Sequence, residues 1–300
     1  MHNTRIVATL TTLPDRYETL LRTLICLKNQ DTKLDAIYLT LPYVATRLNK
    51  KYPELPDEIK KLVTLIRIDQ DLGALSKIYG ALINEQEDNT VIISFDDDCI
   101  YKNTLVSVLM KHHYEHPSCA ICGTGALIKN GLYFSSIKTN VSYLQQYESL
   151  FGFNVPNNGR YVDIIHGFVS SLYTRKFFPK KENLYNELFK YPLMNKHVFC
   201  NDDVLISGYL KKNNIKMMIF NDIPSIIADV KKEDALSFNF LEMLNHFDQA
   251  VLFLKEHGMF QTYEDTYICE SPAVRLCLIA TLLILLVIYI YVVVYKKYKF

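Results

Sequence analysis

The stretch Val91-Ile92-Ile93-Ser94-Phe95-Asp96-Asp97-Asp98 decides the fold of this 300-residue chain. Its first five residues are almost all apolar, which is typical of a strand that is buried on both faces. Three consecutive carboxylates follow, and they repel one another unless a cation or hydrogen-bond donors compensate them. Divalent cations such as Mg²⁺ and Mn²⁺ prefer carboxylate oxygen, so we predict that Asp96 and Asp98 are metal ligands that point the same way from an extended chain. The simpler alternative is an acidic turn that caps the next helix.

Strand-like and helix-like segments alternate before this stretch. β-Branched runs predict strands at 5–11, 36–41 and 62–68, and apolar residues at helical spacing predict helices at 16–28 and 74–83. This alternation predicts βαβ units and a parallel sheet wrapped by helices. Ligands of such sheets bind beyond the carboxyl ends of the strands, where the three aspartates lie. Beyond them we expect helices at 103–113, 204–212 and 238–256, and strands at 119–127 and within 161–173.

Composition narrows the class of protein. Apolar residues make up 49% of the chain, enough for a substantial core, and the net charge of +1 argues against nucleic acid as the main partner. The seven cysteines are scattered and odd in number, which indicates reduced thiols rather than a disulfide framework. Cys119 and Cys122 form a lone C-x-x-C in an apolar run, and we interpret them as small core residues on a strand.

The C-terminal segment has a different character. Residues 276–295 contain no charge, proline or glycine, and twenty helical residues span about 30 Å, the thickness of a bilayer's hydrocarbon core. We predict a transmembrane helix there, preceded by a linker at 261–275 and followed by a basic tail at 296–300. The tail's lysines favour a cytosolic C-terminus, whereas a span this close to the end is typical of a tail anchor. We expect a C-terminally anchored membrane protein whose catalytic body, residues 1–260, lies in the cytosol.

An apolar strand that ends in Asp-x-Asp after an N-terminal βαβ region resembles the GT-A-type glycosyltransferases, in particular those similar to glycosyltransferase family 2. The resemblance covers roughly residues 5–240. It implies a Rossmann-type mixed sheet flanked by helices, with a nucleotide-binding part at about 1–115 and an acceptor-side part at about 116–260. It also implies that Mn²⁺ or Mg²⁺ on the Asp-x-Asp motif positions the diphosphate of a nucleotide-sugar donor, with a UDP-sugar favoured.

The same resemblance assigns further residues. Thr11-Thr12-Leu13-Pro14-Asp15-Arg16 lies where such enzymes begin the nucleotide pocket, and the segment from Asp71 to Lys77 resembles the one that closes over the nucleotide. Lys77 would neutralise phosphate charge, although a solvated helix lysine is the plain alternative. The residues expected to contact the donor are Thr11, Arg16, Asp71, Lys77, Asp96 and Asp97.

Two later motifs complete the predicted site. Asn201-Asp202-Asp203 precedes an apolar helical pattern, so Asn201 would cap that helix and the acids would favour its first turn. By resemblance, Asp203, or Asp202 in its place, is the general base that deprotonates the acceptor hydroxyl. His166-Gly167 resembles an acceptor-side loop. Many enzymes of this type supply a third metal ligand, often a histidine, downstream of the base, but residues 231–237 contain no histidine. The candidates for this ligand are His246, Asp229 and Glu233.

We therefore expect a metal-dependent glycosyltransferase that inverts the anomeric carbon and acts on a glycan, lipid or protein acceptor. One alternative is a haloacid-dehalogenase-like phosphatase, whose nucleophile motif is also Asp-x-Asp after a strand. In that class the motif ends the first strand of the domain, whereas about three strands precede it here. The other alternative is a catalytically inactive, membrane-tethered binding protein on the same fold, because an intact motif does not prove turnover.

Overall fold

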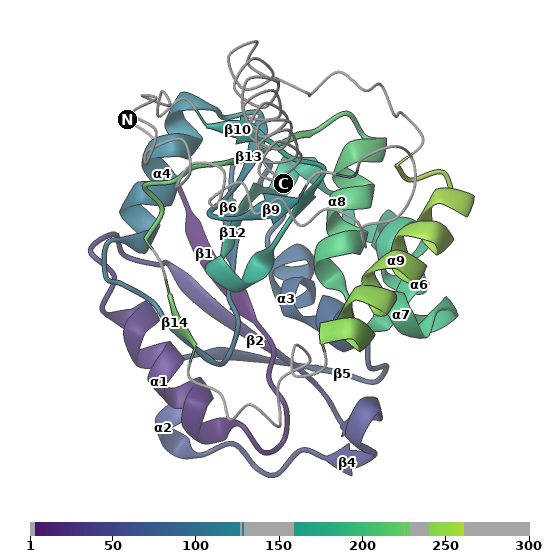
Figure 1. The fold of residues 1–300 in the computed structure, drawn as a ribbon. Coiled ribbons are helices and arrows are strands. Elements are labelled where there is room, and N and C mark those ends of the chain that lie inside the picture. The colour runs from purple at the N-terminus through teal and green to yellow at the C-terminus, as the bar shows by residue number, and fades with distance from the viewer. Residues whose placement is uncertain (1–3, 127, 129–158, 225, 229–239, 261–300) are drawn as a thin grey trace, which may run out of the picture. The chain divides into compact units, whose positions relative to one another are not determined.

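The structure is a computed structural model that describes residues 4–126, 128, 159–224, 226–228 and 240–260 (Figure 1). Its main sheet has eight strands in the order β10-β13-β8-β12-β6-β1-β2-β5. Their bounds are β1 Ile6–Leu10, β2 Ala36–Pro42, β5 Thr64–Ile68, β6 Val91–Ser94, β8 Cys119–Cys122, β10 Arg160–Tyr161, β12 Ser171–Thr174 and β13 Lys216–Ile219. Three small pairs accompany it: β9 Gly125–Ala126 with β11 Ile164–Ile165, β7 Cys99–Ile100 with β14 Ile227–Ala228, and β3 Val44–Ala45 with β4 Lys50–Lys51.

The sheet is mixed. Strands β5, β2, β1 and β6 run parallel, as the βαβ pattern predicts, and β13 runs parallel to β8. Strand β12 lies between β6 and β8 and is antiparallel to both, and β10 is antiparallel to β13. The parallel βαβ arrangement predicted for the strands up to β6 is therefore confirmed, and so is a mixed α/β sheet flanked by helices.

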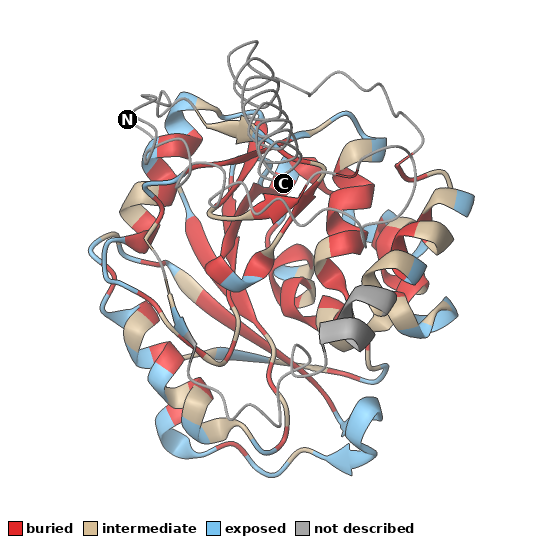
Figure 2. Cartoon of the chain, viewed as in Figure 1, coloured by how far each residue is buried: buried red, intermediate tan, exposed pale blue. Residues whose placement is uncertain are grey.

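Helices cover both faces of this sheet (Figure 1). The helices are α1 Tyr17–Lys28, α2 Asp57–Lys60, α3 Ser76–Asn84, α4 Leu105–Glu115, α6 Lys190–Met194, α7 Lys196–Phe199, α8 Asp202–Lys212 and α9 Phe240–Glu256. Side chains alternate along β1: Ile6, Ala8 and Leu10 share a core with α1 and α4. Val7 points the other way, into a core with α3 and α8, and α9 packs on α8. Figure 2 shows the consequence: the central strands of the sheet are buried, whereas the edge strand β5 is partly exposed.

Several predicted bounds change in the tertiary structure. The strand expected at 119–127 ends at Cys122, and the strand-rich segment 161–173 is broken by a 3₁₀ turn, Gly167–Val169. Both Cys119 and Cys122 are buried in β8, and the five cysteines within the described residues are all free thiols, as predicted.

In the part of the chain that the structure describes, no helix is both long and apolar enough to cross a membrane. The predicted linker, transmembrane helix and basic tail all lie outside the described residues.

Candidate active site

The site lies where the chain reverses its direction across the sheet. From β1 the chain adds β2 and then β5 on one side, and it then returns to place β6 on the other side of β1. Ligands of open α/β sheets bind in the crevice outside the carboxyl ends of the strands at such a switch point. Thr11 and Thr12 follow β1 here, and Asp96 follows β6, with Thr9 and Ser94 in register between the two strands. The three aspartates therefore lie at the edge that the sequence predicts.

A turn, rather than an extended strand, presents the aspartates. The last ladder bond of β6 runs from the Phe95 N–H to the Thr9 carbonyl, at 3.0 Å. The next N–H, that of Asp96, donates instead to the hydroxyl of buried Tyr101 at 2.9 Å, which ends the strand. Asp96 and Asp98 are expected to point the same way if the extended chain continues, but it does not continue, because β6 stops at Ser94.

The turn nevertheless gathers potential metal ligands. One oxygen of Asp96, one of Asp98 and the Cys99 sulfur all lie within 4.8 Å of one another, the one such group within the described residues. The Cys99 thiol lies 3.7 Å from Asp98 Oδ1, and burial raises the pKa of this thiol, which favours its protonated form. Two carboxylates with water and substrate phosphate suit Mg²⁺ or Mn²⁺, so these residues fit the predicted cation.

Arg16 and Lys77 neutralise part of this acidic charge. Arg16 Nη1 lies 3.2 Å from Asp97 Oδ1 and 2.9 Å from Asp98 Oδ2. Lys77 Nζ lies 2.6 Å from Asp96 Oδ1, with only 9% of its side chain exposed. Asp97 is held further by the Thr12 hydroxyl. Arg16 and Lys77 thus both reach the aspartates, whereas Thr12 was not predicted as a site residue.

Lys77 also connects the two halves of the predicted site. Its ammonium group lies 2.9 Å from Asp202 Oδ2, so Asp96 and Asp202 share one buried cation. Thr9 fixes the first turn of α3 against β1, because its hydroxyl donates to the Lys77 carbonyl at 2.5 Å. Burial acts to lower the pKa of Lys77, but the carboxylates of Asp202 and Asp96 outweigh it and hold this pKa well above its usual value. Lys77 is therefore no solvated helix lysine.

Asp202 and Asp203 begin α8 and Asn201 precedes them at the N-cap position, as the motif predicts, but the Asn201 side chain makes no capping hydrogen bond. Its side-chain amide donates instead to the His197 carbonyl at 2.8 Å. Asp203 Oδ1 accepts the backbone N–H of Gly167 at 2.9 Å. A side chain at Gly167 would place its Cβ 2.7 Å from that oxygen, which explains why the close approach uses glycine.

The carboxylates outnumber the cations in this site. Burial raises the pKa of Asp97 to about 6 even though Arg16 opposes the shift. It also raises the pKa of Asp98, where the charge of Asp96 adds to the effect. Burial raises the pKa of Asp203 well above its ordinary value, with Asp202 as the next cause. A divalent cation would offset this excess of negative charge.

The remaining predicted residues have structural partners. Thr11 donates its hydroxyl proton to the Thr40 carbonyl at 2.7 Å. Asp71 accepts the backbone N–H groups of Thr46 and Gly73, at 2.7 and 2.8 Å, and so shapes the turn that leads to Lys77. Contacts of Thr11 and Asp71 with a nucleotide-sugar donor stay predictions.

His166 precedes Gly167 in the chain, and its ring lies near two phenylalanines. The His166 N–H donates to the Thr124 carbonyl at 3.1 Å, which helps to position Gly167, the next residue in the chain. The His166 ring lies 6.1 Å from the ring of Phe168 and 6.2 Å from that of Phe247 on α9, measured between centroids. A substrate contact of His166 stays a prediction.

Of the candidates for a third metal ligand, His246 lies within the described residues and is not part of the group formed by Asp96, Asp98 and Cys99. His246 lies against His197 instead, with ring nitrogens 3.1 Å apart. Asp229 and Glu233 fall outside the described residues. The sequence analysis did not predict Cys99, which follows Asp98 directly, or Tyr101, two residues further on.

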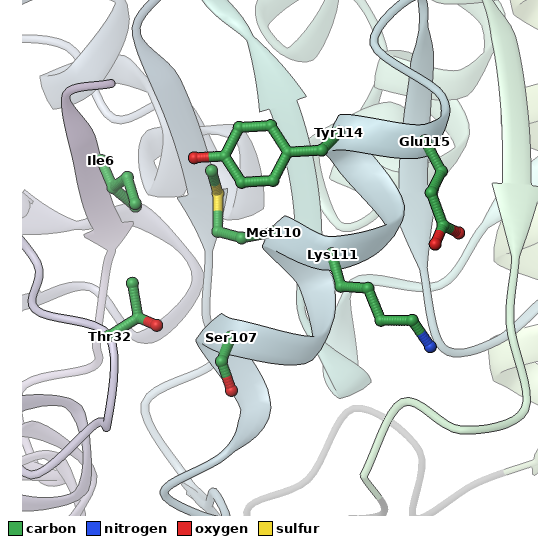
Figure 3. A pocket seen from close by; sticks show the side chains of 7 residues that line it. All are labelled: Ile6, Thr32, Ser107, Met110, Lys111, Tyr114 and Glu115. Atoms are coloured by element: carbon green, nitrogen blue, oxygen red, sulfur yellow. The ribbon is translucent and has the colours of Figure 1, made fainter. Parts of the chain in front are cut away.

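A separate pocket of about 550 Å³ lies on the outer side of α4 (Figure 3). It is lined by Ile6, Thr32, Ser107, Met110, Lys111, Tyr114 and Glu115. Ile6 is the first residue of β1, so this pocket lies at the opposite end of the strand from the aspartates and is not part of the site.

No protein-family model matches this chain, and no curated protein matches it.

Proposed function

We propose that this chain is a metal-dependent glycosyltransferase that moves a sugar from a nucleotide-sugar donor to an acceptor hydroxyl and inverts the anomeric carbon. One observation carries the proposal. Lys77, buried at the switch point of the sheet, contacts both Asp96, of the candidate metal group, and Asp202, beside the candidate base. Transfer from a diphosphate to a hydroxyl requires metal ligands and a general base close together, and Lys77 joins the two groups here.

The donor side is built by Asp96, Asp98 and Arg16. A divalent cation held by Asp96 and Asp98 would neutralise the charge that develops on the departing nucleoside diphosphate. Arg16 fixes the Asp98 carboxylate from the β1–α1 loop, at 2.9 Å. We propose a UDP-sugar as the donor, in keeping with the resemblance of the motif.

The acceptor side is built around Asp203. In the proposed step the acceptor oxygen forms a bond to the anomeric carbon while its proton passes to Asp203. The bond from that carbon to the diphosphate breaks, and its electron pair stays on the diphosphate. Burial and the neighbouring Asp202 raise the pKa of Asp203, which strengthens it as a proton acceptor. The Gly167 N–H holds one of its oxygens in place.

We further propose that residues 276–295 anchor this catalytic body to a membrane, with the body in the cytosol. The support is the uncharged twenty-residue stretch in the sequence. The acceptor is then a lipid, glycan or protein that reaches the membrane surface.

The proposal is tested with the full-length chain in mild detergent, incubated with a panel of nucleotide sugars with and without Mn²⁺. We expect one donor to release nucleoside diphosphate only with metal, and Asp98→Asn to reduce that release at least about 100-fold. Asp88→Asn is the matched control, because Asp88 is an exposed carboxylate paired with Lys180. Release of phosphate from a phosphomonoester, without donor turnover, would identify the phosphatase alternative. A folded protein that is inactive in both assays would favour the binding protein.

Gly167→Ala is expected to lower transfer at least about tenfold while the protein stays folded. The new methyl group would lie 2.7 Å from Asp203 Oδ1 and 3.5 Å from Lys77 Nζ, so the base must move. Such overpacking costs about 1–3 kcal/mol of stability, less than most folded domains possess. Steady-state kinetics with a thermal melt check both parts, and unchanged kcat in a folded variant would show that Asp203 needs no fixed position.

A further inference from the structure

A pair of histidines lies outside the site described above. His197 on α7 and His246 on α9 bring their Nδ1 atoms to within 3.1 Å of each other. Their ring centroids are 4.7 Å apart and the rings are inclined by 58°. Both residues are partly exposed, so an ion in solution has access to them.

The backbone around His197 is held firmly. The Asn195 side chain caps α7 and accepts the N–H groups of His197 and Val198, at 2.8 and 3.2 Å. The His197 carbonyl accepts the side-chain amide of Asn201 at 2.8 Å. Helix α9 packs against both α7 and α8, so the two rings face each other from fixed elements.

This spacing suits two ligands of one metal ion. Metal–nitrogen bonds of 2.0–2.1 Å at tetrahedral or right angles place two ligand nitrogens about 2.9–3.4 Å apart. Imidazole nitrogen favours Zn²⁺, Ni²⁺ and Cu²⁺, in contrast to the carboxylate oxygens that favour Mg²⁺ and Mn²⁺. Burial, and next the neighbouring His246, lowers the pKa of His197, which favours the neutral form of the ring that can bind a metal ion.

We propose that His197 and His246 form a second metal site, which takes a transition-metal ion such as Ni²⁺, Cu²⁺ or Zn²⁺ through both Nδ1 atoms. Water fills the other positions, because the described residues supply no third histidine, cysteine or carboxylate to this pair. The ion would connect α7 to α9.

Both helices that carry the histidine pair also lead to residues of the candidate active site. The chain runs from α7 directly to Asp202 and Asp203, at the start of α8. On α9, Phe247 follows His246 and meets the ring of His166 edge-on. An ion on the histidine pair would therefore stabilise the α9 side of the acceptor region.

To test this, the metal-free, full-length chain in detergent is titrated with Ni²⁺, and the heat of binding is measured by calorimetry. We expect His197→Gln and His246→Gln each to weaken the tightest Ni²⁺ site at least about tenfold. His257→Gln is the matched control, because His257 lies at the end of α9 and its Nδ1 contacts only the Phe253 carbonyl, 2.8 Å away, among the hydrogen bonds described. Asp98→Asn should also leave this site unchanged, which separates it from the carboxylate group.

A second measurement needs no variant. One equivalent of Cu²⁺ in the wild-type chain should give an electron paramagnetic resonance spectrum with coupling to imidazole nitrogen. Equal Ni²⁺ affinity in wild type and both histidine variants, or a Cu²⁺ spectrum of oxygen ligands alone, would overturn the proposal and leave the pair as a hydrogen bond between two rings.

Discussion

Asp203→Asn is expected to reduce the rate of transfer by about 10²- to 10⁴-fold, the usual contribution of a general base, with little change in stability. The substitution keeps the size of the side chain, and an amide oxygen can still accept the Gly167 N–H that Asp203 accepts at 2.9 Å. What it removes is the carboxylate that receives the acceptor proton. In the wild type, kcat/KM should fall as the pH drops through the raised pKa of Asp203, because the protonated carboxyl cannot act as a base.

Asp202→Asn separates the two candidates for the base. Asp202 is paired with Lys77 at 2.9 Å, so this variant should lose stability and retain more of its kcat than Asp203→Asn does. Steady-state kinetics and thermal melts of both variants measure the difference. If Asp203→Asn keeps its activity while Asp202→Asn loses it, the roles are reversed and Asp202 is the base.

Lys77→Met is expected to destabilise the protein by about 3–5 kcal/mol at pH 7, the usual effect of removing one partner from a buried ion pair. The methionine fills a similar volume, but Asp96 and Asp202 lose the one cation that they share. Lys180→Met is the control: Lys180 and Asp88 are about 60% exposed, and an exposed pair contributes about 0–1 kcal/mol. Urea unfolding of the two variants and the wild type provides the comparison.

The destabilisation caused by Lys77→Met should increase as the pH rises. Burial raises the pKa of Asp202, and Lys77 opposes that rise. A carboxyl group with a raised folded-state pKa contributes stability below its unfolded pKa of about 4 and loses it as the pH rises. Without Lys77 this loss of stability is larger. The difference in the free energy of unfolding between the wild type and Lys77→Met should therefore be smallest near pH 4 and grow toward pH 7. A difference in unfolding free energy that is constant across this pH range would show that Lys77 acts through packing rather than charge.

Short-range patterns predicted much of the fold. The apolar run of β6, the β-branched run of β1 and the helical spacing of α1 each depend on residues that lie close together in the chain, so their burial follows from local sequence patterns. The antiparallel entry of β12 between β6 and β8 has no such local signal, because strand pairing depends on packing between distant segments.

The chemistry of the site divides in the same way. The sequence by itself placed Asp96, Asp97 and Asp98 at the end of a buried strand, because an apolar run and adjacent charges need no partner to be recognised. Only the tertiary structure decided that Lys77 lies between Asp96 and Asp202, and that Gly167 holds Asp203. These contacts join residues far apart in the chain, and the free energy of burying a charge selects its partner only when the folded elements have met.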